Sequence, residues 1–474
     1  MSLPEPHPRF ATGTVAVLPP QRRRLAIVST SNKLCGIAAY TGALERHLAD
    51  VFDITVIDLD QYLMRSRHRA VRKQADAYIK KICNELADFD AVNLQVEHGT
   101  LGHETEDIFK RLSWLIVAAP GLSVTLHTFK LPASLPRDFA KALLAREFRK
   151  GGNIWRAYRR NERLSLGIAR RLREAQRQKP VSVIVHSRRD ARHSRHLYQL
   201  DNVFDHPLSF LSTSEAAAIT ASAARRRFAL LERLPEDSVL IGVFGFLDAY
   251  KGFGTTIRAL HHLPKNHHLL IFGGTHPNEI PVGQPIHPYL SSLFEEAYVD
   301  TTPYDRMANQ ASPSLSLGAD RYLAELLGNH PRDLSERIHF MGALDDDDFL
   351  AGMAICDTTV FPYLEVGQSA SGPISQALEL GRRIIASRTH NFLEFAAYHP
   401  NAIEFFDIGN HLELAERILA RPQYAARRGP PAYNVETNKA VYLAANSPLA
   451  AGASRIRRLG AAVSAALPRR LAGG

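Results

Sequence analysis

The sequence is poor in cysteine, with three thiols, Cys35, Cys83 and Cys356, lying far apart among 474 residues. An odd, widely spaced set of cysteines gives no disulfide framework and is typical of a reducing compartment. The spacing of cysteine and histidine resembles no zinc site, so the sequence predicts no metal centre. We therefore expect a cytoplasmic protein.

Long hydrophobic runs are also missing. The longest apolar stretch, around Trp114 to Leu126, is interrupted by Pro120 and Gly121 and does not reach the length of a transmembrane helix. The first residues lack the apolar stretch of a signal peptide, which argues against export.

Acidic residues are outnumbered. The chain has 58 Lys and Arg against 48 Asp and Glu, a formal net charge of +10. This balance favours an anionic partner such as a nucleotide, an anionic lipid surface or a nucleic acid. No helix-turn-helix, zinc-finger or RNA-binding signature is present, so nucleic acid is the weakest of the three. The length exceeds what one hydrophobic core accommodates, which predicts two globular domains.

Apolar strands alternate with helical stretches through the first half of the chain. Strands are predicted at Leu25–Thr30, Ile54–Leu59, Ala91–Val96, Leu122–Leu126 and Val181–His186. The alternation predicts an α/β domain with a doubly wound parallel sheet. Ligands of such sheets bind beyond the carboxyl ends of the strands. Five residues fall at or just past those ends: Lys33, Gly36, Glu97, His98 and His127.

The second half repeats this organisation. Strands are predicted at Val239–Phe244, His268–Phe272, Ile338–Met341, Thr358–Tyr363 and Arg383–Ser387, with residues 278–332 irregular. We expect a flexible arm at 1–23, a first domain at 24–215, a second at 216–430, a helix within 431–447 that crosses back to the first domain, and a tail at 448–474.

The stretch from Phe361 to Ser387 carries the clearest binding signal. It reads as strand, loop, helix and strand, with Ser371 and Gly372 near the N-cap and Pro373 at the first helical position. The free N–H groups and positive dipole end of such a helix suit a phosphate. An ordinary βαβ unit that binds nothing explains the stretch equally well. Lys251, after another strand, would add an ammonium group to the same cleft and strengthens the diphosphate interpretation.

Two charged stretches have alternative explanations. Residues 137–179 hold fourteen Lys and Arg against four Asp and Glu, with Trp155 and Tyr158 among them. They predict one or two basic amphipathic helices, either with a solvated charged face or with a surface that docks onto anionic lipid. The acidic run Asp345 to Asp348 could suggest a metal site, but capping of a helix N-terminus explains it more simply.

Several known motifs are absent. No GxSxG, Walker or early GxGxxG sequence is present, which disfavours hydrolases, P-loop NTPases and dinucleotide dehydrogenases. Other short motifs occur in a fixed order: CGIAAYT at 35–41, LQVEHGTLG at 94–102, TLHTF at 125–129, Lys251-Gly252, GGTHPNEI at 273–280 and QSASG at 368–372. Over residues 24–447 the chain resembles the retaining glycosyltransferases of family 4, in particular the bacterial branch with CGIA and Q-x-x-SG motifs.

The resemblance implies a GT-B fold, in which two Rossmann-like domains face each other across a cleft. The second domain would bind a nucleotide-sugar donor, and the first would add Gly36 to the donor site. The implied donor-binding residues are Gly36, Gly245, Lys251, Gly274, Met341, Gly342, Gln368, Ser371, Gly372, Pro373 and Gln376. The implied acceptor-binding residues are Lys33, Glu97, His98 and His127. His127, Lys251 and Gln368 would be catalytic, with no metal or other cofactor, because Lys251 and a helix dipole would neutralise the leaving diphosphate.

The sequence departs from the wider family at two places. Gln368 and Gln376 stand where that family has two glutamates, and Phe246 and Leu247 stand in the loop where it has an arginine. The resemblance implies transfer of a hexose, mannose from GDP-mannose being a candidate, to a saccharide or lipid-linked saccharide in surface polysaccharide synthesis. The alternatives are a catalytically silent member that binds nucleotide sugar or acts as a scaffold, and a nucleotide-sugar epimerase of the same fold.

Overall fold

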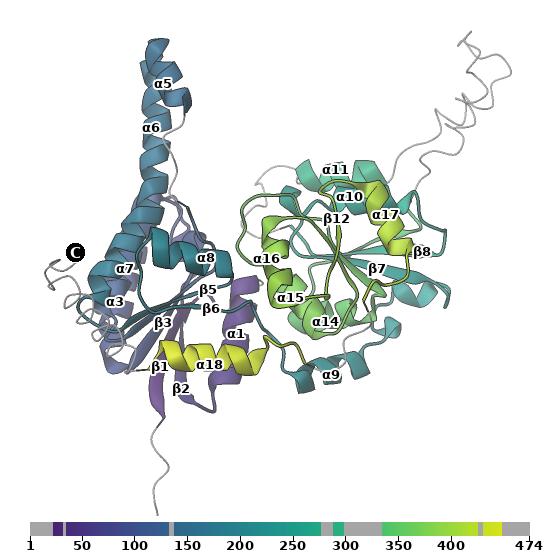
Figure 1. Cartoon of the computed structure of the whole chain (residues 1–474), viewed down its shortest axis with the longest axis horizontal. Helices are drawn as coiled ribbons and strands as arrows, with labels where there is room; N and C mark the ends of the chain where they lie inside the picture. Colours follow the sequence, from purple (N-terminus) through teal and green to yellow (C-terminus); the bar gives the residue numbers. More distant parts are fainter. Residues whose placement is uncertain are drawn as a thin grey trace, which may run out of the picture.

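The computed structural model describes residues 22–31, 35–131, 137–275, 288–297, 334–424 and 430–447. Two lobes lie side by side, and each contains a parallel six-stranded sheet flanked by helices (Figure 1). Of the arm expected at 1–23, residues 1–21 lie outside the described residues, whereas Arg23 is the first residue of a strand, so the arm was predicted too long at its end. The expected tail at 448–474 and Lys33 also lie outside the described residues.

The N-terminal sheet has the strand order β2-β1-β3-β4-β5-β6. Its strands are β1 Arg23–Ser29, β2 Phe52–Asp58, β3 Ala91–Val96, β4 Leu122–Leu126, β5 Val181–Val185 and β6 Val203–Asp205. The helices around it are α1 Gly36–Leu48, α2 Gln61–Met64, α3 Arg69–Glu85, α4 Thr105–Ala118, α7 Ile168–Gln176 and α8 Arg188–Arg192. The chain reverses its direction of winding between β1 and β3, which places a crevice at the carboxyl end of β1.

The C-terminal sheet has the order β12-β11-β10-β7-β8-β9. Its strands are β7 Val239–Phe244, β8 His267–Phe272, β9 Ile338–Gly342, β10 Thr358–Phe361, β11 Ile384–Ser387 and β12 Glu404–Phe406. Its helices are α10 Phe253–Leu260, α11 Pro288–Ala297, α14 Asp346–Ile355, α15 Gly372–Glu379, α16 His390–Tyr398 and α17 His411–Leu419. Here the winding reverses between β7 and β10, so the loops after these two strands flank a second crevice.

Two sequence expectations change in this lobe. Residues 288–297 form helix α11 inside the stretch that we expected to be irregular. The strand expected to reach Tyr363 ends at Phe361, because Pro362 has no N–H to continue the ladder. The acidic run does cap a helix, since the Asp345 carboxylate accepts a hydrogen bond from the N–H of Asp348 at the start of α14.

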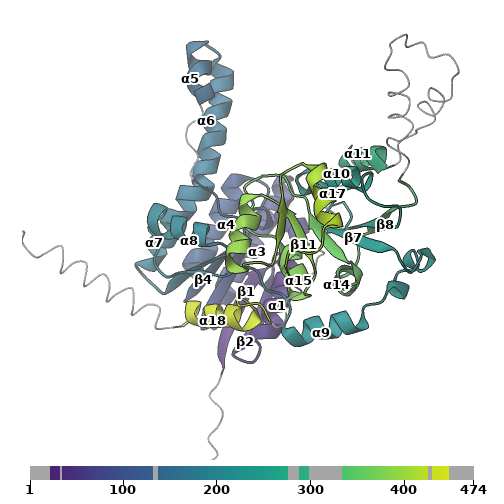
Figure 2. The ribbon, with the colours of Figure 1, turned by 45° about the vertical axis from the view of Figure 1, so that its right-hand side comes forward.

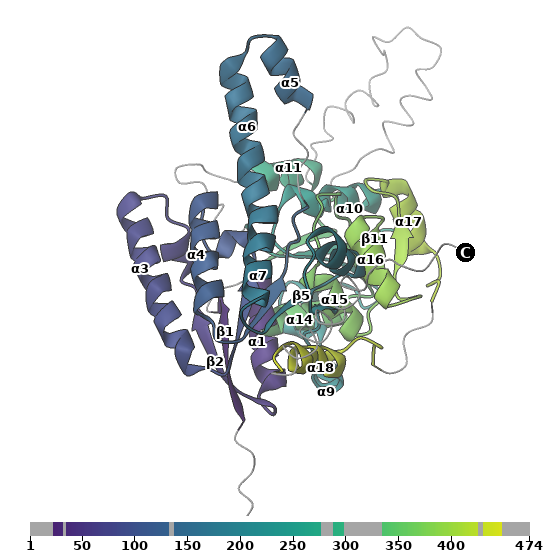
Figure 3. The ribbon, with the colours of Figure 1, turned by 60° about the vertical axis from the view of Figure 1, so that its left-hand side comes forward.

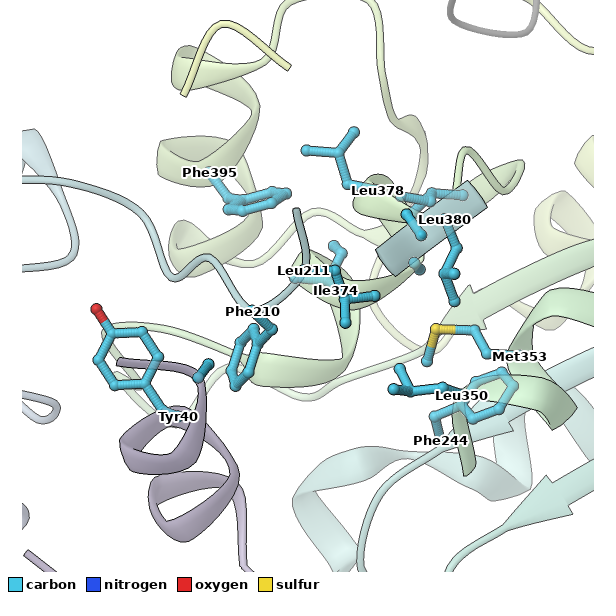
Figure 4. Packing of buried hydrophobic residues seen from close by; sticks show 14 of the residues in the cluster. Tyr40, Phe210, Leu211, Phe244, Leu350, Met353, Ile374, Leu378, Leu380 and Phe395 are labelled. Carbon is cyan, nitrogen blue, oxygen red and sulfur yellow. The ribbon is translucent and has the colours of Figure 1, made fainter. Parts of the chain in front are cut away.

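A hydrophobic core continues from one lobe to the other. Tyr40 of α1, Phe210 and Leu211 of the connecting segment, and Phe244 and Ile374 of the C-terminal lobe belong to one buried cluster (Figure 4). The connecting segment leads into helix α9, Thr213–Ser222. Burial of apolar area across the boundary holds the lobes together at the base of the cleft.

The last described helix, α18 (Val435–Ala445), returns to the N-terminal lobe and packs against α1, β5 and β6. Its Tyr442 hydroxyl lies 3.1 Å from Gln95 Nε2 and 3.0 Å from Thr125 Oγ1, inside the N-terminal sheet. The chain therefore crosses between the lobes twice, once through the segment before α9 and once before α18.

The basic stretch forms a projecting hairpin. Helix α5 (Arg137–Leu144) and helix α6 (Phe148–Glu162) extend away from the N-terminal lobe (Figure 2). A π-helical turn, Arg163–Gly167, connects α6 to α7 on the body of the lobe. Among the residues that the structure describes, no helix has the length and apolar character to cross a bilayer.

Candidate functional site

A cavity of about 270 Å³ opens between the lobes at the two crevices. Its lining comes from the start of α1, from the loops after β7, β8, β9 and β10, and from the start of α15. Nine residues that the resemblance assigned to donor binding line this one cavity: Gly36, Gly245, Lys251, Gly274, Gln368, Ser371, Gly372, Pro373 and Gln376.

Glycines let the backbones around this cavity approach closely. Gly252 has a φ of +65°, and a Cβ there would lie 2.1 Å from the carbonyl oxygen of Pro362. Gly273 has a φ of +144°, and its Cβ would lie 1.9 Å from the carbonyl oxygen of Gly245. Both positions combine a left-handed backbone with no room for a side chain, so the two loops at the floor of the cavity depend on glycine.

Lys251 is a buried cation at this floor. Its ammonium group donates to the Tyr363 hydroxyl and lies 3.9 Å from the Tyr363 ring centroid and 5.0 Å from that of Tyr250. Within the described part of the chain, no carboxylate forms an ion pair with it. Burial lowers the pKa of Lys251 to about 7, and Asp248 partly opposes the shift. Two aromatic rings thus hold a lysine that has no counter-ion of its own.

The start of α15 faces the same space. Ser371 occupies the N-cap, but its side chain makes no capping bond; its Oγ lies 3.1 Å from the Tyr363 hydroxyl instead. Burial raises the pKa of Tyr363, so its hydroxyl stays protonated. The first N–H groups of α15 are left without a side-chain cap where Gly372 and Pro373 line the cavity. A free helix N-terminus beside an unpaired ammonium group is an arrangement that binds anions.

Gln368 lies on the loop between β10 and α15. Its Oε1 atom is buried and has no hydrogen-bond partner. Glu365 holds the loop from within the lobe, because its carboxylate accepts from His390 N at 2.7 Å and Gly367 N at 3.0 Å. Ser369, on the same loop, ties it to the N-terminal lobe, because its Oγ accepts a hydrogen bond from Phe129 N at 3.0 Å. The amide of Gln368 is therefore fixed at the cavity wall with an acceptor oxygen left over.

His127 lies at the carboxyl end of β4 in the N-terminal lobe. Its Nε2 is 2.7 Å from Gln95 Oε1, and its ring centroid is 5.0 Å from that of His186 and 5.6 Å from that of Tyr40. Burial lowers its pKa well below the usual value, with His186 contributing. Gln95 offers a carbonyl oxygen, so Nε2 carries the proton of a neutral imidazole and Nδ1 is left as an acceptor.

None of the three described acceptor-site candidates, His127, Glu97 and His98, is among the residues that line the cavity. The Glu97 carboxylate accepts from the Thr128 hydroxyl and the His98 N–H. His98 lines a separate small cavity beside Phe129 and Lys130, where burial lowers its pKa to about 4. Because these residues do not line the cavity between the lobes, the acceptor assignment stays a prediction.

The donor-binding residues expected at the end of β9 are displaced along the chain. Met341 and Gly342 end β9 and do not line the cavity, whereas the following Ala343 and Leu344 do. Asp346 and Phe349 of α14, Tyr250 after β7 and Phe210 of the connecting segment also line it and were not found from the sequence. The apolar sequence LSFL at 208–211, between the two domains, is the feature from which a buried position for Phe210 could have been predicted.

No family model matches the chain, and no curated protein matches it in sequence. Solved structures match over nearly its full length. The α,α-trehalose-6-phosphate synthase of Burkholderia multivorans is 11% identical with a TM-score of 0.53, and the match covers 96% of this chain and 100% of that one. The sucrose-phosphate synthase of Thermosynechococcus elongatus is 14% identical with a TM-score of 0.52, covering 93% and 100%.

The fold is GT-B. A further match, the UDP-forming α,α-trehalose-phosphate synthase of Burkholderia vietnamiensis, is 11% identical with a TM-score of 0.52 and covers 93% of this chain and 99% of that one. At these identities the likeness concerns the fold. The expected architecture of two facing Rossmann-like domains with a cleft between them is confirmed, and the cavity described above is the cleft of this GT-B chain.

Proposed function

We propose that the chain is a glycosyltransferase that moves a hexose from a nucleotide sugar to a saccharide or lipid-linked saccharide. The observation that carries this proposal is that two anion-binding groups line the cavity between the lobes. They are the ammonium group of Lys251, which has no carboxylate partner among the described residues, and the start of α15, which has no side-chain cap. A nucleotide sugar brings a diphosphate, which both groups would bind, and a sugar, which Gln368 would contact.

The same two groups account for the leaving group. As the bond from the anomeric carbon to the diphosphate breaks, negative charge grows on the departing oxygen, and preorganised donors stabilise it. Lys251 and the N–H groups of α15 would supply this stabilisation without a metal. We propose retention of configuration, with the leaving phosphate taking the proton of the acceptor hydroxyl. His127 would lie on the acceptor side and bind the sugar as a neutral imidazole.

The donor and the place of action are finer parts of the proposal. GDP-mannose is the donor that the sequence resemblance favours, and a UDP-sugar is its rival because one matching structure is that of a UDP-forming synthase. We propose an acceptor in surface polysaccharide synthesis and peripheral attachment to the anionic inner face of a membrane through residues 137–179. Such attachment should weaken as salt shortens the Debye length.

Slow hydrolysis of nucleotide sugars tests the proposal. The protein should release nucleotide from one member of a panel that includes GDP-mannose and UDP-glucose. Lys251→Ala should lower that rate, because the loss of one preorganised donor costs about 2–4 kcal/mol of transition-state stabilisation. The control is Lys439→Ala, which removes the ion pair between Lys439 on α18 and Asp50, outside the cavity lining. Near-normal turnover in Lys251→Ala would overturn the assignment.

The same panel separates the alternatives. Binding without hydrolysis would support the catalytically silent form, which the glutamines at Gln368 and Gln376 and the missing loop arginine favour. Interconversion of sugars would support an epimerase.

A further inference from the structure

Helices α5 and α6 pack against each other as a hairpin that projects from the N-terminal lobe. All three ribbon views show it extending from the N-terminal lobe (Figure 3). The two helices pack through Ala142, which is buried, and Gly151, whose missing Cβ would lie 3.8 Å from the Ala142 Cβ. Close packing of small residues keeps the hairpin together, yet nothing in the rest of the described chain covers its end.

Large apolar side chains gather at that end. Leu144 is 86% exposed, Phe148 is 69% exposed and Leu143 is 44% exposed, on both sides of the turn that joins α5 to α6. We call these three residues the tip. Exposing such side chains to water is unfavourable, and a cluster of them at the extremity of a projection marks a contact surface. Four cationic residues lie in or beside this turn, Lys141, Arg146, Arg149 and Lys150, and two of them form ion pairs, Lys141 with Asp138 and Lys150 with Glu147.

The chemistry changes in order along α6. Trp155 follows Phe148 by two helical turns, about 10 Å at 1.5 Å per residue, and is 42% exposed. Its ring centroid lies 5.7 Å from that of Phe139 and 5.6 Å from that of Tyr158. Tryptophan and tyrosine concentrate at the level of lipid headgroups.

Further from the tip lies a groove of about 580 Å³ along α6, α7 and α4. Six arginines line it: Arg156, Arg159, Arg160, Arg163, Arg170 and Arg171. Glu106, Glu162 and Glu174 also line it and pair with three of these arginines. Among the described residues, the other three, Arg156, Arg160 and Arg170, have no carboxylate partner. The groove therefore keeps an excess of positive charge that suits lipid phosphates.

We propose that the tip inserts into an anionic bilayer with α6 steeply inclined to its surface. Leu144 and Phe148 would enter the acyl boundary, Trp155 would lie among the headgroups, and the arginine groove would face phosphates. This inference rests on the membrane attachment proposed above and adds its depth and orientation. We propose an anionic bilayer as the partner, and not a second copy of the chain, because the residues around the tip are basic and two such hairpins would repel each other.

Tryptophan fluorescence with vesicles tests the insertion. The chain has two tryptophans, so Trp114→Phe leaves Trp155 as the only reporter. On phosphatidylcholine vesicles containing phosphatidylglycerol, its emission should shift to the blue and be quenched more by lipids brominated near the headgroup than by lipids brominated at the chain end. Pure phosphatidylcholine should give a weaker response. An unshifted spectrum on anionic vesicles would overturn the proposal.

Cosedimentation with the same vesicles isolates the tip. The double variant Leu144→Ser, Phe148→Ser should reduce partitioning at least about tenfold. The matched control is Leu412→Ser, Leu419→Ser on α17, where each leucine is 52% exposed, and it should bind like the wild type. Unchanged, salt-sensitive binding of the tip variant would overturn insertion while leaving electrostatic attachment intact. A wild-type dimer in solution that the tip variant abolishes would assign the tip to self-association and would also overturn it.

Nucleotide-sugar hydrolysis keeps this test separate from the proposed activity. The tip variant should hydrolyse the donor at the wild-type rate in the absence of vesicles, because the tip is remote from the cavity between the lobes. That result would also show that the variant is folded. Absence of hydrolysis in the wild type would defeat the proposed reaction without affecting the vesicle result.

Discussion

At the scale of single residues, Lys251 couples the cleft to pH. Burial lowers its pKa to about 7, so the ammonium form is largely lost in the empty cleft above that pH. A bound diphosphate favours the ammonium form and must raise the pKa again. Below pH 7 the lysine is charged with or without donor, whereas above pH 7 binding has to take up a proton.

Donor affinity should therefore be constant below pH 7 and fall by up to tenfold per pH unit above it. Calorimetric titration of a nucleotide sugar between pH 6 and 9 measures this, and the sugar-substituted diphosphate does not itself titrate there. Lys251→Met should bind weakly and without the slope. Equal affinity of the wild type at pH 7 and pH 9 would show that the lysine stays charged or does not meet the diphosphate.

Gln368 presents a buried amide oxygen without a partner at the cleft wall. Gln368→Glu should weaken donor binding, because a carboxylate near the diphosphate repels it. Gln368→Ala should keep donor affinity and lower turnover, because the sugar loses a positioning contact. Dissociation constants and rates for both variants check this, with Gln423→Ala, outside the cavity lining, as the control. Unchanged affinity in Gln368→Glu would refute the electrostatic argument.

At the scale of elements, α15 is tied at its far end to the segment between the lobes. The Glu379 carboxylate accepts from Ser209 Oγ at 2.7 Å, Phe210 N at 2.9 Å and Leu211 N at 3.1 Å. Burial raises the pKa of Glu379 to about 8, and these hydrogen bonds oppose the shift. The helix that offers its N-terminus to the cleft therefore holds the connecting segment with its C-terminus.

Removing this acceptor should destabilise the protein. In Glu379→Ala three buried donors lose their partner, at a cost of about 1–3 kcal/mol each when unsatisfied, of which relaxation of the segment recovers part. We expect a loss of about 2–4 kcal/mol in the free energy of unfolding by denaturant. Glu416→Ala on the exposed face of α17 should change it by less than about 0.5 kcal/mol. A wild-type unfolding midpoint for Glu379→Ala would mean that water replaces the carboxylate.

Elements with strong periodic patterns could be predicted from the sequence, and those defined by tertiary contacts could not. Strands β3, β4 and β7 lie at the expected residues, because buried parallel strands are continuous apolar runs. The three-residue strands β6 and β12 were missed, since so few residues show no alternation. The sequence predicts the basic helices of the hairpin. It does not predict that they project from the lobe, because projection depends on the absence of tertiary contacts between these helices and the rest of the lobe.

The cleft shows the same division. Lys251 and the start of α15 were predictable because a glycine-marked turn after a strand is a local pattern. The Tyr363 hydroxyl that joins Lys251 to Ser371, and Phe210 from the connecting segment, were not, because their roles arise from residues distant in sequence. The displacement from Met341 to Ala343 at the end of β9 follows an irregular register beside Phe272.

At the scale of the whole molecule, several polar contacts join the two lobes, and one of them lies beside the candidate site. Ser369 Oγ accepts from Phe129 N across the cleft, one residue after Gln368. A second contact lies further from the site, where the Tyr398 hydroxyl of α16 donates to Asp205 of β6 at 2.8 Å. The other end of α16 reaches the Gln368 loop, because the His390 N–H donates to Glu365. Both contacts join the lobes, but only that of Ser369 also fixes the Gln368 loop.

Closure of the lobes should therefore set the position of Gln368 through Ser369. Ser369→Ala should lower turnover about tenfold, near 1.4 kcal/mol, while donor affinity stays unchanged, because the groups proposed to bind the diphosphate belong to the C-terminal lobe. Ser369→Thr keeps the hydroxyl and should recover part of the rate. Tyr398→Phe also removes one hydroxyl contact between the lobes and should reduce turnover by less than about threefold, because the Gln368 loop remains held. Donor titration and turnover of the three variants measure both quantities. Equal losses in Ser369→Ala and Tyr398→Phe would show that closure acts on the site as a whole, with no separate contribution from the contact beside Gln368.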